Sequence, residues 1–138
     1  GRMTVHVGAS GAGATIKLVN NMLSGTMTAA MAEAVSIAQA AGVDPEATQA
    51  VLAEGPVASR LLRTKLPKML GHDFSAQFQL ALMEKDLRYF LALAQQVDRP
   101  APMASLVRSQ FQAARRAGFG AMDTSALVAH IGGEAPKG

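Results

Sequence analysis

Apolar and small residues dominate the chain from residue 12 to residue 41, and no proline interrupts them. Gly42 is a natural C-terminal stop, so the pattern predicts one helix from about Ala12 to Ala41. About 30 residues at roughly 1.5 Å each would make a helix of about 45 Å, longer than a small domain is wide. Such a helix must be covered by several others or extend into a partner subunit. Its middle, residues 24–32, is rich in small residues, which fits core packing or a dimer seam.

Shorter helices are predicted downstream from their start and stop signals. They cover residues 47–54 after the cap Asp44-Pro45, residues 59–70 with an interruption at Pro67, residues 78–97, residues 104–117, and residues 123–131, where Asp123 is the predicted cap. Glu84 and Arg88 stand four residues apart and are predicted to pair on the outer side of the third of these helices. The fold class predicted is all-α, a bundle of about five to seven helices around one long central helix.

Met3, Val5 and Val7 alternate with polar residues and predict a short strand that ends at Gly8. A lone strand has no pairing partner in a helical chain. We therefore interpret residues 1–8 as the end of an upstream domain that is missing from this chain. Residues 9–131 are predicted to form the helical domain, and residues 132–138 a disordered tail.

Composition narrows the function classes. Hydrophobic residues make up 49% and aromatic residues 4%, which predicts close-packed helices with a core of Ala, Leu, Val and Met. The chain contains no cysteine, which excludes disulfides and thiolate chemistry and is consistent with a cytoplasmic location. No apolar run reaches membrane-spanning length, and no cluster of His, Cys or acidic residues indicates a metal site. The net charge of +3 is scattered, and the basic run in residues 60–68 is interpreted as a solvated face, with a phosphate site as the alternative.

Lys17 is the one charged residue between Val7 and Ala32, and no carboxylate stands three or four residues away to pair with it. Near a helix N-terminus, the macrodipole disfavours the charged form of lysine, so Lys17 is a candidate proton carrier. Free N–H groups around Gly11 and Gly13 would favour a substrate carboxylate or phosphate. Asn21 lies one turn further on the same side and could hold the reacting oxygen. The alternative is an ordinary surface lysine.

Two motifs resemble those of a known family. Gly8-x-x-Gly11-x-Gly13-x-x-x-Lys17-x-x-Asn20-Asn21 is similar to the catalytic-helix signature of the β-hydroxyacid dehydrogenases, and Phe78 with Lys85-Asp86-Leu87 resembles a second motif of that family. The resemblance extends over nearly the whole chain. It implies an all-helical C-terminal domain, like that of the 6-phosphogluconate dehydrogenase-like family, which normally follows a nucleotide-binding domain.

The resemblance also implies roles for single residues. Lys17 would exchange a proton with the substrate hydroxyl, and Asn21 would hydrogen-bond the same oxygen. Gly11, Gly13 and Asn21 would help to bind a small hydroxyacid. Phe78, Lys85 and Asp86 would contact NAD or NADP, which the missing domain would mostly bind. We expect a homodimer or homotetramer, and we expect the isolated chain to be inactive.

A different class of function remains open from the sequence. The chain could be a non-catalytic all-α dimerisation or binding module that keeps Lys17 for structural reasons. A nucleic-acid-binding helical domain would need a clustered basic face, which only residues 60–68 offer.

Overall fold

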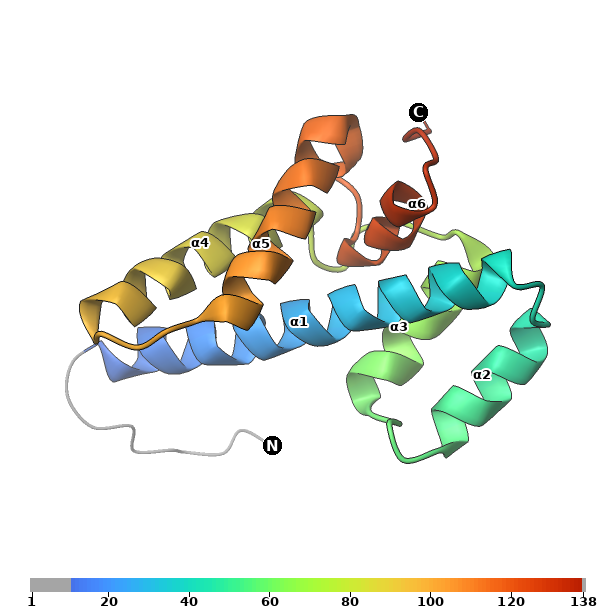
Figure 1. Ribbon diagram of the computed structural model, residues 1–138, viewed down its shortest axis with the longest axis horizontal. Coiled ribbons are helices and arrows are strands. Elements are labelled where there is room, and N and C mark those ends of the chain that lie inside the picture. Colours follow the sequence, from blue (N-terminus) through green and yellow to red (C-terminus); the bar gives the residue numbers. More distant parts are fainter. Residues whose placement is uncertain (1–10, 138) are drawn as a thin grey trace.

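One long helix, α1 (Ala12–Ala40), carries most of the structure along its length (Figure 1). The computed structural model describes residues 11–137, so the strand predicted for residues 2–8 lies outside the described residues. The other elements are α2 (Pro45–Glu54), α3 (Arg60–Gly71), α4 (Leu80–Gln96), α5 (Pro102–Ala114), the π-helical turn η1 (Arg115–Phe119), the 3-10 turn η2 (Thr124–Ala126) and α6 (Leu127–Ile131). The predicted all-α bundle is confirmed, with six α-helices and no strand within residues 11–137.

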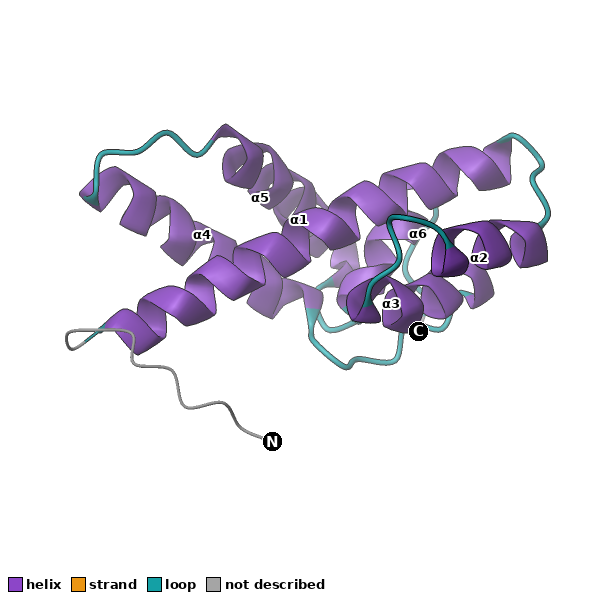
Figure 2. Ribbon diagram, turned by 90° about the horizontal axis from the view of Figure 1, so that it is seen from below, coloured by secondary structure: helices purple, strands orange, loops and turns teal. Residues whose placement is uncertain are grey.

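Helices α3, α4, α5 and α6 contact α1, whereas α2 packs mainly on α3 (Figure 1 and Figure 2). Helix α4 runs antiparallel to α1, because Leu18 of α1 lies near Tyr89 and Gly25 lies near Met83. Helices α3 and α6 pack on the C-terminal part of α1. The N-terminal part of α1 therefore has α4 and α5 as its neighbours, and its other sides stay open (Figure 1).

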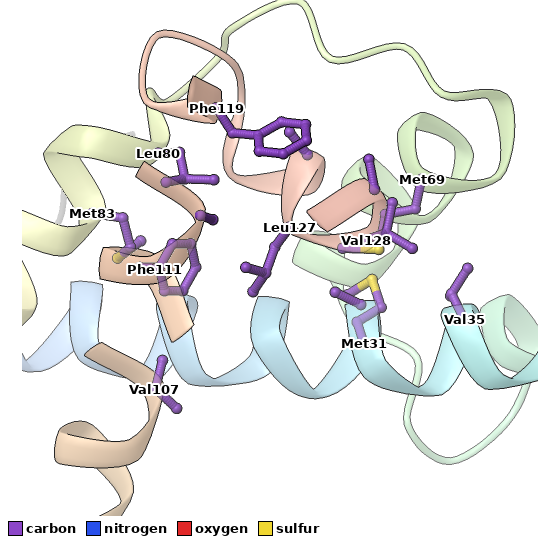
Figure 3. Packing of buried hydrophobic residues seen from close by; sticks show 14 of the residues in the cluster. Met31, Val35, Met69, Leu80, Met83, Val107, Phe111, Phe119, Leu127 and Val128 are labelled. Carbon is purple, nitrogen blue, oxygen red and sulfur yellow. The ribbon is translucent and has the colours of Figure 1, made fainter. Parts of the chain in front are cut away.

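The core follows the helical repeat of α1, whose buried positions are Gly25, Thr28, Met31, Ala32 and Val35. In Figure 3, Met31 and Val35 lie beside Met69 of α3 and Val128 of α6, and Phe111 of α5 lies between Met83 and Leu127. The aliphatic and methionine-rich core expected from the composition is thus joined by two phenylalanines, Phe111 and Phe119.

The small residues in the middle of α1 allow α4 to approach closely. A Cβ on Gly25 would lie 2.8 Å from Sδ of Met83, so glycine is needed there unless Met83 moves. This face of residues 24–32 therefore packs within the chain, which is the core-packing interpretation of that segment.

Side-chain caps define the starts of α2 and α3. Asp44 accepts a hydrogen bond from the N–H of Ala47 at 3.1 Å, as the Asp-Pro signal predicted, and Ser59 accepts one from Leu62 at 3.0 Å. The predicted interruption at Pro67 is wrong, because α3 continues to Gly71. Pro67 lies on the exposed side, where water can bind the carbonyl that lacks its helical partner.

Two predicted boundaries shift. Helix α4 begins at Leu80 rather than Phe78, because residues 77 and 78 are hydrogen-bonded to Asp123 instead. Helix α5 begins at Pro102 and passes into the turn η1, where Gly118 has a φ of 105° that favours glycine. His72, which the sequence left unexplained, ends α3 in the left-handed conformation with a φ of 52°.

The C-terminal segment makes contacts in the structure. Nε2 of His72 lies 2.9 Å from Oε2 of Glu134, and a Cβ on Gly118 would lie 2.9 Å from Cγ of Pro136. Residues 132–137 thus lie against the α3–α4 turn and η1, although the sequence predicted a disordered tail from residue 132 onward.

The predicted pair of Glu84 with Arg88 is wrong, because Glu84 points inward and is only 3% exposed. Nε of Arg115 donates to Oε1 of Glu84 at 3.0 Å, and Nε of Arg108 lies 3.7 Å from Oε2. Both arginines come from the α5–η1 segment. One buried carboxylate therefore ties α4 to that segment, next to Lys85 and Asp86.

We expect Glu84→Gln to lower the free energy of unfolding by about 1–3 kcal/mol, because it removes the buried charge that Arg108 and Arg115 face. Urea denaturation followed by circular dichroism would measure it. The control Glu33→Gln changes an exposed carboxylate of α1 and should stay within about 0.5 kcal/mol of the unmodified chain. Equal effects of the two substitutions would contradict the structural role of Glu84.

Candidate functional site

Polar residues of α1, among them the predicted catalytic residues Lys17 and Asn21, form a stripe that runs from solvent into the interior. Lys17, Asn21, Ser24 and Thr28 recur at helical spacing. Lys17 is exposed, Asn21 and Ser24 are partly buried, and Thr28 is fully buried. Within the described residues, Lys17 lies on the surface of this domain rather than in its interior.

Lys17 has no ion-pair partner among residues 11–137. This agrees with the isolation from carboxylates that its sequence neighbourhood predicts. The ammonium group is thus available to a ligand that approaches the open side of α1.

A hydrogen bond joins the two predicted motifs. Nδ2 of Asn21 donates to Oδ2 of Asp86 at 2.7 Å, across the contact between α1 and α4. The carboxylate only accepts, so it fixes the amide with its nitrogen toward Asp86 and leaves the amide oxygen and one N–H for a ligand. Residues 65 positions apart, one predicted to bind substrate and one to bind cofactor, therefore meet where α1 and α4 are in contact.

Gly11 and Gly13 lie at the N-terminal end of α1. Gly11 is the N-cap of α1 with a φ of 93°, and no side chain caps the helix. A Cβ on Gly11 or Gly13 would meet nothing within 4 Å. The first turn of α1 therefore presents backbone rather than side chains, as an anion-binding helix N-terminus requires.

Lys85 lies in the second turn of α4, and Phe78 lies two residues before the helix begins. Lys85 is exposed, and no described residue forms an ion pair with it. Phe78 is partly buried and packs against the core, so only part of its ring faces outward. The backbone N–H of Phe78 is bound by the side chain of Asp123, so Asp123 helps to place the ring.

Asp123 is a fully buried carboxylate with a dense set of hydrogen bonds. Its Oδ1 accepts from the N–H groups of Gln77 and Phe78 at 3.0 and 3.1 Å, and its Oδ2 accepts from the N–H and hydroxyl of Ser125 at 3.0 and 2.6 Å. Nζ of Lys65 lies 2.9 Å from both oxygens. Burial alone would raise the pKa of Asp123, but the hydrogen bonds from Ser125, Lys65 and Phe78 outweigh it and lower the pKa to about 2.

The solvated basic face predicted for residues 60–68 is wrong for two of its four members. Lys65 is 5% exposed and pairs with Asp123, and Nζ of Lys68 donates to the hydroxyl of Ser75 at 3.3 Å. The Ser75 hydroxyl and N–H, with the charge of Lys68, hold the pKa of Asp73 below its ordinary value. With these lysines inside the fold, the clustered basic face that nucleic-acid binding would need is not formed.

Sequence reasoning identified Asp123 as a helix cap but missed Lys65. The available signal was the position of Lys65 on α3, since Leu62, Leu66 and Met69 mark that side as the buried one. A lysine on an apolar helix face requires a buried partner, because an unpaired buried charge is costly. Asp123 could have been proposed as that partner.

The comparisons with known proteins decide the family. Residues 11–131 match the protein family described as NAD-binding of NADP-dependent 3-hydroxyisobutyrate dehydrogenase. The chain belongs to this family. The family comprises NAD(P)-dependent β-hydroxyacid dehydrogenases, so the resemblance stated from the two motifs is confirmed.

Two relatives show how much of their own length this chain covers. It is 33% identical over 129 residues to 2-(hydroxymethyl)glutarate dehydrogenase of Eubacterium barkeri, covering 93% of this chain and 43% of that protein. The crystal structure of 3-hydroxyisobutyrate dehydrogenase from Salmonella typhimurium superposes with a TM-score of 0.82 at 29% identity, covering 86% of this chain and 41% of that one. The chain thus spans about two fifths of these relatives.

One relative carries a different kind of name. The cytokine-like nuclear factor N-PAC of Xenopus tropicalis is 31% identical over 127 residues, covering 92% of this chain and 24% of that protein. The chain is therefore also similar to a protein whose name does not describe a dehydrogenase.

The donor groups near the contact between α1 and α4 suit anionic ligands. Lys17 and Lys85 are exposed cations without carboxylate partners in the described part of the chain, and Asn21 keeps free amide groups. No group of three or more His, Cys, Asp or Glu among residues 11–137 could hold a metal ion. None of the described helices is long and apolar enough to cross a membrane.

The pKa of Asp123 predicts how stability responds to acid. Because folding lowers this pKa from an ordinary 3.8 to about 2, the carboxylate stabilises the fold above pH 4 by about 2 kcal/mol, and this contribution disappears as the pH falls toward 2. Urea denaturation of the unmodified chain and Asp123→Asn at pH 5.5 and pH 2.5 would test it. The difference between the two proteins should shrink at the lower pH, and a constant difference would contradict the assignment. The comparison cancels the contribution of Asp73, which both proteins share.

Proposed function

We propose that this chain is the C-terminal substrate- and cofactor-closing domain of an NAD(P)-dependent β-hydroxyacid dehydrogenase, similar to 3-hydroxyisobutyrate dehydrogenase. The observation that supports it most is the Asn21–Asp86 hydrogen bond, which joins the α1 motif to the α4 motif. The share of its relatives that the chain spans agrees with a domain that works beside a nucleotide-binding domain.

In this proposal, Lys17 is the proton acceptor of the oxidative direction. As a neutral amine it takes the proton of the substrate hydroxyl, and as an ammonium it returns that proton in the reductive direction. Asn21, held by Asp86, donates its remaining N–H to the same substrate oxygen. NAD or NADP, when bound, would accept the hydride that leaves the carbon bearing the hydroxyl.

The remaining groups bind rather than react. The backbone around Gly11 and Gly13 would receive the substrate carboxylate at the N-terminus of α1. Lys85 would bind an anionic group of the cofactor, and the outward part of the Phe78 ring would pack on it. The open side of Lys17 would be closed by the nucleotide-binding domain, which would exclude water from the reacting groups.

Lys17→Ala should lower kcat for hydroxyacid oxidation by about 10²–10⁴-fold, because general-base catalysis typically contributes that much. The measurement uses the enzyme in which a nucleotide-binding domain precedes this chain. Lys17→Arg should not restore activity, since arginine stays protonated and cannot accept the proton. Lys137→Ala, an exposed lysine of the C-terminal segment, is the matched control and should retain activity.

A loss of less than a few-fold in Lys17→Ala would favour the other candidate, a non-catalytic binding module. The observation behind that candidate is the similarity to N-PAC, a protein named as a nuclear factor. The two proposals differ in the role of Lys17, so the same measurement separates them.

We also propose that the chain forms a homodimer through the outer face of α1. Exposed apolar and small residues follow this face at intervals of three, four or seven residues, namely Ile16, Leu23, Met27, Ala30, Ala34 and Ile37. This spacing is that of helices that pair along their length. A second copy of the same helix is the natural partner for such a long face, since a twofold axis matches it with itself.

Leu23→Asp and Met27→Asp should each shift the chain from dimer to monomer, because a charge at a paired apolar face is left desolvated. Sedimentation velocity at roughly 10–100 µM would measure the change. Val51→Asp alters an apolar residue on α2 that is more exposed than Leu23 and Met27 and lies away from this face, and it should leave the dimer intact. An unmodified chain that sediments as a monomer over this range would contradict the proposal.

A further inference from the structure

We propose that Asp123 and Lys65 form a positioning pair that fixes the backbone of Gln77 and Phe78, and through it the contact of Phe78 with the cofactor. This inference rests on the proposed function, because it deepens the part assigned to Phe78. It adds two residues that neither motif contains.

The two oxygens of Asp123 divide their partners between two segments. Oδ1 binds the consecutive N–H groups of Gln77 and Phe78, in the segment that leads into α4. Oδ2 binds Ser125 at the start of η2, which leads into α6. Lys65 of α3 contacts both oxygens and so orients the carboxylate plane. The segment before α4 is therefore held against two other elements through one side chain.

Backbone hydrogen bonds continue the attachment on both sides. The N–H of Asp123 donates to the carbonyl of Phe74 at 2.9 Å, and that of Thr124 donates to the carbonyl of Phe78 at 3.0 Å. The N–H of Leu80 donates to the carbonyl of Met122 at 2.8 Å. These contacts extend from Phe74 to Leu80, the first residue of α4, and include an isolated antiparallel bridge between Gln79 and Asp123. Asp123 supplies the acceptor for the two N–H groups in the middle of this segment.

A buried ion pair is weak grounds for stability, since apolar residues of similar volume often stabilise a fold equally well. Hydrogen bonds differ from apolar contacts in being directional, so they fix the backbone at a defined position. Phe78 lies at that position and is partly exposed, two residues before α4 begins. The direction of its side chain therefore depends on a backbone that Asp123 holds.

The first test uses the chain itself. The double variant Asp123→Ala/Lys65→Met removes the pair without leaving a buried charge unpaired. Amide hydrogen exchange by NMR should show a loss of protection of tenfold or more at Gln77 and Phe78, beyond the change at core amides. Val128→Ala, a core truncation in α6, is the stability control and should change protection evenly. The milder Asp123→Asn/Lys65→Met keeps an acceptor for the two N–H groups and should restore part of their protection, also if the first variant folds poorly.

The second test measures the dissociation constant of NADH or NADPH by fluorescence, in the enzyme that joins this chain to a nucleotide-binding domain. Asp123→Ala/Lys65→Met should raise it about tenfold, whereas Val128→Ala should leave it unchanged at a temperature where both are folded. In a Phe78→Ala background the pair should have little further effect, because coupled residues are not additive.

The outcomes separate the inference from the function on which it rests. Additive effects of Phe78→Ala and the pair, or even exchange at Gln77 and Phe78 after the pair is removed, would overturn the inference alone. A dissociation constant that Phe78→Ala does not change would overturn the assignment of Phe78 together with the inference. The test of Lys17 is independent of all of these results.

Discussion

The placement of Phe78 and of the segment before α4 depends on the ion pair of Lys65 with Asp123. Its cost is the desolvation of two charges, and six hydrogen-bond contacts to Asp123 offset that cost. The low pKa of Asp123 shows that the charged form is the stable one despite burial. The pair links α3 to the start of η2 and to the segment before α4. Without it, the segment before α4 and the start of η2 would be joined by backbone hydrogen bonds and apolar contacts alone.

The contact between α1 and α4 fixes the positions of the candidate site residues on the two helices. Gly25 brings the two helices close at Met83, and Glu84 fixes the far side of α4 to the α5–η1 segment. Asp86, two residues after Glu84, then meets Asn21 on the opposite helix. Each of these contacts restrains the rotation of α4 about its axis. The relative placement of Lys85 and Lys17 follows from that restraint, since each lies within one turn of the hydrogen-bonded pair.

Local signals in the sequence predicted the local structure. The long helix, the caps at Asp44 and Asp123, and the all-α class depend on residues within a few positions of one another, and they are confirmed. The ion pairs depend on distant residues and were missed. The i,i+4 rule paired Glu84 with Arg88, whereas its partners come from the α5–η1 segment, and Lys65 meets Asp123 across 58 positions. The family motifs named Asn21 and Asp86 separately, but their hydrogen bond needed the packing of two helices. The roles of Lys17, Phe78 and Lys85, and the cytoplasmic location, stay predictions.

The two ends of α1 serve different purposes, and this explains why a lysine proposed for catalysis lies on an exposed turn. The C-terminal part of the helix buries Met31, Ala32 and Val35 against α3 and α6, so the free energy of packing is concentrated there. The N-terminal part carries Gly11, Gly13 and Lys17, whose substitution removes no core contact. A rigid helix anchored at one end can hold reactive groups at the other without burying them in its own domain. Residues at the open end are then free to be selected for chemistry, because stability is secured about four turns away.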